Sequence, residues 1–256
     1  MIAREENERV LLREAGKRLG AVLSAVAQAA RVGATSAELD SLALKLIAEG
    51  GDRAAFLDYT PSGAKRPFPA ALCVSINNEV VHGIPNEHPR TLKEGDIVSL
   101  DLGLTHRGFV VDAAVTVPVG VIDAAAKRLI AATKEALEDG IHQAVVGNTV
   151  GDISFAIGAS IKKSGFSPAN ELGGHGVGER VHEEPYVPNW GTRGEGEKIV
   201  EGLVLALEPI VNEGSGNIRS LSDGYTIVTR DGKRSAHFEH TILVTKKGPE
   251  ILTVLN

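Results

Sequence analysis

Two aspartates stand in the two arms of one apolar hairpin, and they constrain the fold more than any other feature. The stretch 94–118 contains two runs rich in Val, Ile, Leu, Phe and Thr on either side of the polar tip 105–108, which predicts two antiparallel strands. With the turn centred between positions 106 and 107, Asp101 is expected directly opposite Asp112, with Cβ atoms about 4.5 to 5.5 Å apart. Like charges in such a pair destabilise the sheet, so a positive group is expected between them.

The neighbours of these aspartates indicate that both carboxylates are buried. Both faces of the predicted hairpin are apolar, and a buried carboxylate must be paired or must coordinate a metal. A hard or borderline divalent cation is the simplest partner. The residues expected on the aspartate face are Ile97, Ser99, Gly103, Val110 and Ala114.

Composition narrows the class of protein. With 256 residues, 43% of them hydrophobic, and a mean hydropathy near zero, the chain can bury a large core. The net charge of -6 is spread along the chain, which argues against binding to nucleic acid or a membrane surface. The single cysteine, Cys73, excludes an internal disulfide and is typical of a reducing compartment. Without an apolar signal segment or a run of 18 apolar residues, a soluble cytoplasmic protein is expected.

The chain contains an internal repeat. Helices are expected over 5–30 and 35–48, the second starting at a capping box of Thr35 and Glu38, and again over 124–145 and from 149 to about 165. The segments 32–39 and 146–153 share the pattern Val-Gly-x-Thr-x-x-acid-aliphatic, and the strand 94–101 is echoed by 201–208. We therefore predict an α+β fold of two pseudo-twofold related helix-helix-sheet halves, roughly 1–120 and 121–256, around a curved antiparallel sheet in a single catalytic domain.

The repeat brings further carboxylates into the same region. It aligns Asp101 with Glu208, while a strand over 236–244 carries Glu239 and corresponds to the arm of Asp112. Four carboxylates then converge on the pseudo-twofold axis. One divalent ion would not neutralise four negative charges, whereas two would.

Three of the histidines lie beside glycine or proline. His175 is in the segment Gly-Gly-His-Gly-Val-Gly, where glycines permit a close approach of the main chain to a site. His182 precedes Glu-Glu-Pro, and His82 lies where a strand breaks into Gly-Ile-Pro. Together with the carboxylates, these three are candidate site residues. By contrast, His88, His106 and His142 are expected to be ordinary surface residues.

This set of residues resembles type I methionine aminopeptidases over nearly the whole chain. The resemblance rests on Asp101 and Asp112 eleven residues apart, GGHGVG, HEEP, LEP, FEHT and NNEVVHGIP. It implies the pita-bread fold and a centre of two divalent ions, with Co, Mn, Fe and Zn all compatible with the ligands. By the same resemblance, the metal ligands are Asp101, Asp112, His175, Glu208 and Glu239, with Asp112 and Glu239 bridging the two ions.

The resemblance also implies a reaction. A water or hydroxide shared by the two metals would attack the scissile carbonyl, and Glu208 would shuttle the proton. His182 would stabilise the oxyanion, and His82 would contact the scissile amide nitrogen. The substrates would be N-terminal methionines of nascent proteins and peptides whose second residue is small. Expected partners are thus nascent chains, with the ribosome as a candidate place of action, and neither nucleic acid sequences nor membranes; a monomer is expected.

The expected methionine pocket departs from the commoner family pattern. Tyr59, Phe68 and Cys73 fall where the pocket would be lined. Val181 and Tyr225 stand where the family often has an aromatic residue and a tryptophan, and the loop 60–67 is longer than usual. These differences leave the strictness for methionine open.

Three other assignments remain. Proline-specific dipeptidases and aminopeptidases carry the same five ligands but normally add a large N-terminal domain, whereas only about 90 residues precede the first ligand strand here. Type II methionine aminopeptidases carry a helical insertion in the second half, for which 183–208 leaves little room. A non-catalytic binding protein of this fold would lack several of the ligands.

Overall fold

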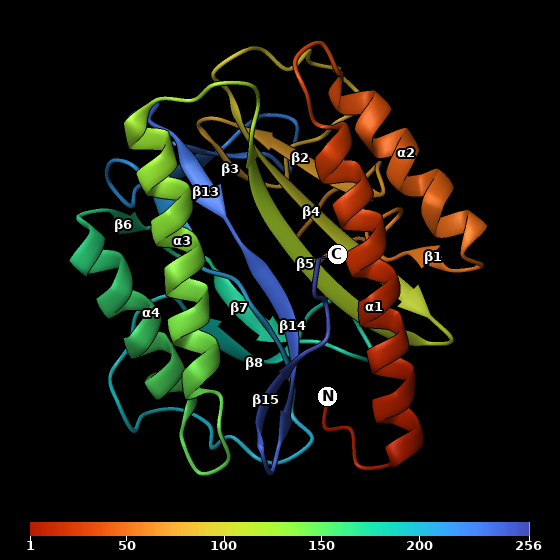
Figure 1. Ribbon diagram of the computed structural model, residues 1–256, viewed down its shortest axis with the longest axis vertical. Coiled ribbons are helices and arrows are strands. Elements are labelled where there is room, and N and C mark those ends of the chain that lie inside the picture. The colour runs from red at the N-terminus through yellow and green to blue at the C-terminus, as the bar shows by residue number, and fades with distance from the viewer. Residues whose placement is uncertain (256) are drawn as a thin grey trace.

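A curved antiparallel sheet of nine strands forms the centre of the protein, for which a computed structural model describes residues 1–255 (Figure 1). β2 and β15 each pair with one strand of the main path, β4 and β14 respectively. In spatial order the path is β1 (Arg53–Ala54), β4 (Ile97–His106), β5 (Phe109–Pro118), β14 (Glu239–Thr245), β9 (Val204–Leu207), β7 (Gly173–Gly176) and β8 (Glu183–Pro188), and the two side strands are β2 (Leu72–Ile76) and β15 (Gly248–Ile251).

Two small sheets of three strands complete the β structure. In the first, β10 pairs with both β13 and β6, and in the second, β12 pairs with both β11 and β3. The bounds are β13 (Ser235–His237), β10 (Ile210–Asn212), β6 (Ser167–Pro168), β11 (Ile218–Ser220), β12 (Ile227–Thr229) and β3 (Glu79–Val81).

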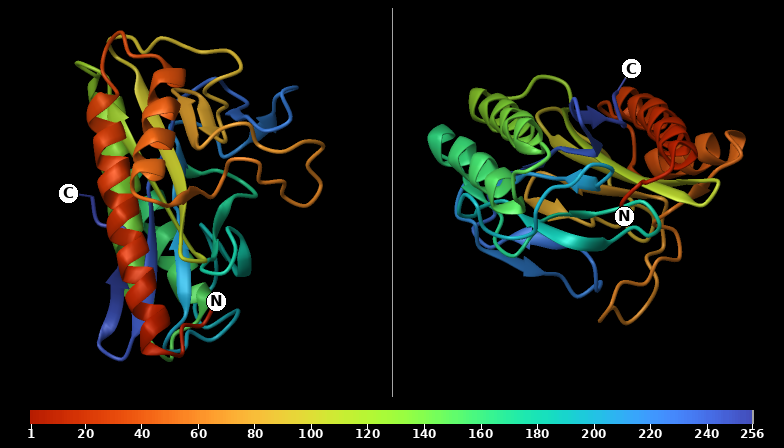
Figure 2. Two further views of the ribbon diagram at one scale, coloured as in Figure 1. Left: turned by 90° about the vertical axis from the view of Figure 1, so that its right-hand side faces the viewer. Right: turned by 90° about the horizontal axis from the view of Figure 1, so that it is seen from below.

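Four helices lie on one face of the main sheet, and the small sheets and long loops lie on the other (Figure 2). They are α1 (Glu6–Ala29), α2 (Ser36–Glu49), α3 (Ala124–Gln143) and α4 (Val150–Ser164). The predicted capping box is present, since Glu38 N–H donates to Thr35 Oγ1 at 3.2 Å and the Glu38 carboxylate accepts from Thr35 N–H at 2.8 Å. Thr149 and Asp152 repeat the same box at the start of α4. The local sequence thus starts α2 and α4 in the same way.

The core follows the two halves of the sheet. One apolar cluster joins α1 and α2 to β4 and β5, and a second joins α3 and α4 to β9 and β14. Both faces of β4 and β5 are buried, as their continuous apolar sequences predict. The spatial order β4, β5, β14, β9 therefore places the expected repeat symmetrically about the junction of β5 with β14.

The register of the central hairpin differs from the prediction. Asp101 pairs with Ala114, and Asp112 pairs with Gly103, so the two aspartates are diagonal neighbours rather than directly opposed. The reason is the turn, which consists of Arg107 and Gly108, both with positive φ (48° and 92°), as a two-residue type I′ hairpin requires. The shift is two residues, so the aspartates still share a face.

The strand expected over 236–244 is also different, because it is broken at Phe238. β13 belongs to a small sheet, whereas β14 starts at Glu239 and belongs to the main sheet. The chain thus changes sheets directly before a carboxylate of the candidate site.

The expectation that His106 is a surface residue is wrong. Its side chain is buried, and its Nδ1 lies 2.6 Å from Oδ1 of Asp52. Asp52 is also paired with Arg18 at 3.3 Å. His88 and His142 are exposed as expected. Within residues 1–255, none of the helices has the length and apolar character needed to cross a membrane.

Candidate metal centre and active site

The four carboxylates lie close to one row across the main sheet. Ala114 on β5 pairs with Asp101 on one side and with Glu239 on the other. Glu208 directly follows β9, whose last residue Leu207 pairs with the residue after Glu239. Asp112 lies two residues before Ala114 on β5 and projects from the same face. The antiparallel register therefore brings together the two arms of the hairpin and two segments that are distant from it in sequence.

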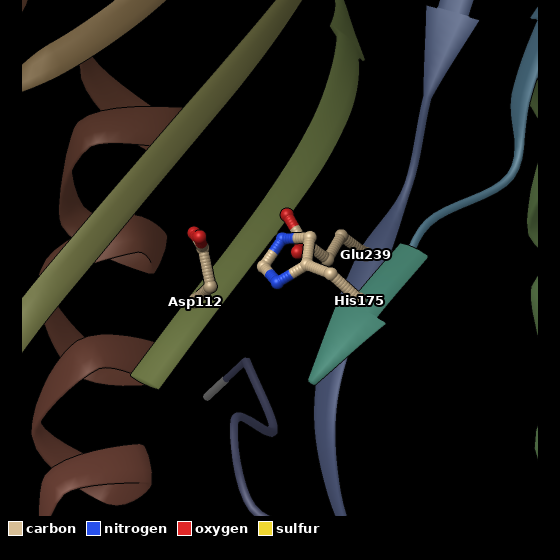
Figure 3. Close-up of side chains that lie close together, drawn as sticks. All are labelled: Asp112, His175 and Glu239. Carbon is tan, nitrogen blue, oxygen red and sulfur yellow. The ribbon is translucent and has the colours of Figure 1, made fainter. Parts of the chain in front are cut away.

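His175 completes the cluster from β7. Ligand atoms of Asp112, His175 and Glu239 all lie within 4.8 Å of one another, and these side chains point toward a shared space (Figure 3). Nδ1 of His175 lies 2.9 Å from the carbonyl oxygen of Gly176, so it donates there when the imidazole is neutral. Nε2 then presents a free lone pair on the side of the carboxylates, 3.5 Å from Glu208.

Burial disfavours the ionised form of the four carboxyl groups in this cluster. Burial, together with the charge of Glu208, raises the pKa of Asp112 to about 8, and burial raises the pKa of Glu208 to about 8. The pKa values of Asp101 and Glu239 are raised well above their usual range by burial and then by the neighbouring carboxylates. Burial also lowers the pKa of His175 to about 4, which keeps it neutral and able to bind a cation.

The donor set fits a divalent cation. One oxygen each of Asp101, Asp112 and Glu239 is buried without a hydrogen-bond partner among residues 1–255. Buried polar atoms are otherwise almost always paired, so these oxygens fit coordination to a cation. Carboxylate oxygens with one imidazole suit Mn, Fe, Co or Zn.

Two further histidines border the cluster. The ring of His182 lies 4.5 Å from that of His175, and its Nδ1 is 2.9 Å from the hydroxyl of Tyr59. His82 follows β3 with a positive φ of 58°, the predicted break of the strand. Burial, and then the nearby His182, lowers the pKa of His82 to about 4, so this imidazole is neutral at neutral pH.

An apolar slot adjoins the cluster. Phe68 and Tyr225 pack edge to face with ring centroids 5.1 Å apart, and Cys73 is buried beside them. The Tyr225 hydroxyl donates to the carbonyl of Arg66, so Tyr225 fixes the loop 60–67 as well as lining the slot. The pocket formed by slot and cluster is lined by all of the predicted site residues: Tyr59, Phe68, Cys73, His82, Asp101, Asp112, His175, His182, Glu208, Tyr225 and Glu239.

Sequence reasoning missed three neighbours of this site. Phe56 and Pro61 also line the pocket, but loop positions carry no periodic signal. His237 is buried, with Nε2 at 3.3 Å from Glu208 and 3.9 Å from Glu239. Its position two residues before Glu239, on the same side of an extended chain, was an available signal.

Without metal, the folded state should lose stability as pH rises from about 6.5 to about 8. Carboxyl groups of an unfolded chain titrate near pH 4, whereas those of Asp112 and Glu208 titrate at about 8 in the folded chain. The folded chain thus holds extra protons, and their contribution is complete below about pH 4 and lost as pH rises through about 8, at about 1.4 kcal/mol per pH unit for each proton. Below about pH 6.5, histidines with a lowered pKa, such as His175, act in the opposite sense.

Thermal unfolding of chelator-treated protein at pH 6.5 and 8 measures this loss. Asp112→Asn removes one of the titrating groups and should flatten the dependence on pH, and added divalent metal should remove it. Equal slopes for the parent chain and Asp112→Asn would contradict the electrostatic account.

Comparisons of the sequence and of the structure with known proteins all match metallopeptidases. The sequence model of metallopeptidase family M24 matches residues 10–246. A methionine aminopeptidase of Clostridium perfringens is 45% identical over 255 residues, covering 100% of this chain and 99% of that protein. The structure of a methionine aminopeptidase from Thermotoga maritima matches with a TM-score of 0.94 at 40% identity, covering 99% of this chain and 100% of that one.

A more distant likeness concerns the fold alone. An Xaa-Pro dipeptidase from Bacillus anthracis matches with a TM-score of 0.78 at 20% identity, covering 98% of this chain and 62% of its own. Together with the match to the Thermotoga maritima structure, it confirms the predicted pita-bread fold.

Proposed function

This chain belongs to metallopeptidase family M24, and we propose that it removes the N-terminal methionine from peptides and nascent proteins whose second residue is small. One observation carries the proposal: an apolar slot opens directly onto a buried cluster of carboxylates and histidines in a single pocket. The slot suits an unbranched apolar side chain, and the cluster lies where the adjoining peptide bond would be.

The proposed cofactor is a pair of divalent ions. The residues that would hold them are Asp101, Asp112, His175, Glu208 and Glu239. Two ions would balance the four carboxylates. When bound, the ions supply Lewis acidity to the scissile carbonyl and make a water acidic enough to attack near neutral pH.

The protein side chains would then position groups and move protons. His182, whose pKa is lowered by burial, stays neutral, and acceptance of a hydrogen bond from Tyr59 at Nδ1 leaves its proton on Nε2. Nε2–H would donate to the oxyanion that develops from the carbonyl. His82 would contact the scissile amide nitrogen, and Glu208 would carry the proton from the attacking water to the leaving amine.

The apolar slot should give a measurable preference for methionine. Burial of the methionine side chain is worth about 1.5 to 3 kcal/mol, so Met-Ala peptides should exceed Ala-Ala peptides by at least about tenfold in kcat/KM. Norleucine should be accepted nearly as well as methionine, because an apolar pocket distinguishes similar chains only weakly. Assays on Met-Ala-Ser, norleucine-Ala-Ser and Ala-Ala-Ser test this ranking.

The same assays discriminate between family members. Rapid cleavage of X-Pro dipeptides without preference for methionine would move the assignment to proline-specific relatives, which share the fold. Binding of peptides without cleavage in the presence of metal would indicate a non-catalytic protein.

The remaining expectations concern the setting of the reaction. We propose a single catalytic domain that works as a monomer in the cytoplasm on nascent chains, with the ribosome as a candidate place of action. The net charge of -6 disfavours direct binding of nucleic acid.

A further inference from the structure

Glu183 holds the turn that leads to His182. It is the first residue of β8, and its side chain is 9% exposed. One carboxylate oxygen accepts hydrogen bonds from the backbone N–H groups of Glu179 and Arg180, both at 2.7 Å. Hydrogen bonds to a carboxylate are stronger than those between neutral groups. The turn 178–182 is therefore held by hydrogen bonds to Glu183, the residue that directly follows His182.

The second oxygen of the same carboxylate accepts from the α-ammonium group of Met1 at 2.6 Å. The ammonium group also donates to the carbonyl of Val177 at 3.1 Å, and the Met1 side chain is only 4% exposed. Burial is the largest influence on the pKa of Glu183 and acts to raise it, yet the pKa is lowered because the ammonium and the two backbone N–H groups stabilise the anion. When one partner of a charge pair with such low side-chain exposure is removed, the remaining charge is unpaired and the folded state loses stability.

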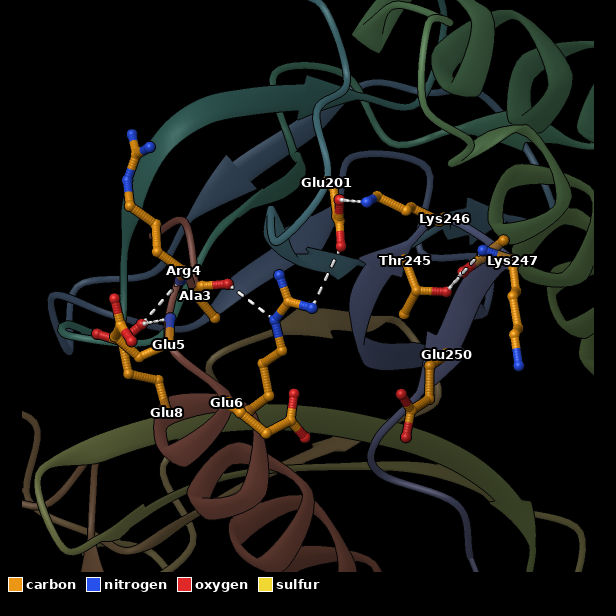
Figure 4. Close-up of polar contacts among 12 residues, drawn as sticks. Ala3, Arg4, Glu5, Glu6, Glu8, Glu201, Thr245, Lys246, Lys247 and Glu250 are labelled. Atoms are coloured by element: carbon orange, nitrogen blue, oxygen red, sulfur yellow. Dashed lines mark hydrogen bonds and ion pairs between the residues drawn. The ribbon is translucent and has the colours of Figure 1, made fainter.

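The first residues of the chain are fixed in place, so this ammonium has a defined position. Ile2 forms a bridge with Leu203, and Ala3 N–H donates to the carbonyl of Gly202 at 2.7 Å. Arg9 donates to the carbonyl of Ala3 at 3.0 Å and pairs with Glu201 at 3.3 Å (Figure 4). The Met1 side chain lies against Gly178, where an added Cβ would come within 2.3 Å of its sulfur.

The turn has other restraints as well, since the Val181 side chain is buried in the apolar cluster of α1, α2, β4 and β5, and Gly178 N–H donates to the carbonyl of Arg180 at 3.3 Å. The Gly178 carbonyl accepts from Val110 N–H at 2.7 Å, which fixes the start of the turn on β5. At its end, the His182 side chain lines the pocket, and its hydrogen-bonding contact is the Tyr59 hydroxyl. The carboxylate of Glu183 is the group that joins the backbone of residues 179 and 180, in the middle of the turn, to the Met1 ammonium.

We propose that Glu183 is a positioning residue for His182, and that the α-ammonium of Met1 is its counter-charge. This inference rests on the oxyanion role of His182 proposed above. Glu183 acts through the turn, because one of its oxygens binds the backbone of residues 179 and 180 and the other binds the ammonium. A modification that neutralises the Met1 nitrogen should therefore loosen a catalytic turn.

The first experiment measures how often the turn opens, and it does not depend on peptidase activity. Trypsin can cleave after Arg180, and mass spectrometry measures the rate at this bond. Glu183→Gln keeps the volume but loses the charge, and we expect at least about tenfold faster cleavage, since loss of hydrogen bonds to a charged group increases the open population by that order. Glu179→Gln is the matched control, because only the backbone of Glu179 makes these contacts.

The second experiment tests coupling to His182. Displacement of a catalytic group by about 1 Å can cost about a hundredfold, so Glu183→Gln should lower kcat by about ten- to a hundredfold with little change in KM or in bound metal. In a double-mutant cycle, Glu183→Gln should add almost nothing to the loss in His182→Ala. Additive losses would overturn the positioning role.

The third variant leaves Glu183 in place. Acetylation of the Met1 nitrogen removes the counter-charge and should accelerate cleavage after Arg180 in the same direction. Wild-type cleavage rates in both Glu183→Gln and the acetylated chain would overturn the proposal, whatever the activity. If His182→Ala itself retained full activity, the proposed role of His182 would be wrong, while the trypsin rates would still decide whether Glu183 holds the turn.

Discussion

Asp112→Ala should abolish nearly all peptidase activity and remove the bound metal. Asp112 lies at the centre of the carboxylate cluster, with ligand atoms within 4.8 Å of those of His175 and Glu239. Loss of this carboxylate removes a ligand of the proposed ions. Because metal catalysis supplies several kcal/mol of transition-state stabilisation, kcat/KM should fall by at least about 10³-fold.

The measurement combines metal analysis of the purified protein with the Met-Ala-Ser assay. Glu239→Ala should behave in the same way, and circular dichroism should show a folded chain, because removal of one buried anion relieves repulsion when metal is absent. Asp139→Asn on α3 is a matched control that should keep both metal and activity. A fully active preparation without metal would refute the dinuclear proposal.

His182→Ala should lower kcat by about 10²- to 10³-fold, the usual loss for one oxyanion donor. Its ring lies 4.5 Å from that of His175, yet its Nδ1 is engaged by Tyr59 rather than by a carboxylate. The metal content should therefore remain normal. Tyr59→Phe, which removes only the partner of Nδ1, should cause a smaller loss of the same kind.

His142→Ala, at an exposed position on α3, is the control for this series. Normal kcat in His182→Ala would exclude the oxyanion role. Loss of metal in that variant would instead make His182 a ligand and would require a different assignment of the cluster.

Local sequence rules were sufficient for much of the site. The period of two along a strand puts Asp101 and Asp112 on one face, and this holds even though the predicted register was wrong by two residues. The repeated capping boxes and strands identified the two halves, and they linked Asp101 to Glu208 before any contact was known. Helix starts, strand faces and repeats can be inferred in this way because they are encoded by neighbouring residues.

Other features depended on segments that meet only in the folded chain. The type I′ turn at Arg107 and Gly108 set which residues face each other, although both alternatives fit the strand pattern. His106 lies at the polar tip of the hairpin, where an exposed side chain was expected. It is instead buried, and it contacts Asp52, which follows the end of α2. His237 meets Glu208 only in the folded chain, because Glu208 comes from the segment that follows β9.

The sequence by itself determined the ligand types, the faces on which they lie and the family of the fold. Only the tertiary structure decided which charges are buried together, and burial is what raises the pKa of Asp112 and Glu208 to about 8 and favours a cation beside them. It also decided that the α-ammonium group of Met1 lies beside Glu183. Electrostatic energies depend on distance and on exclusion of water, and neither is a property of residues adjacent in sequence.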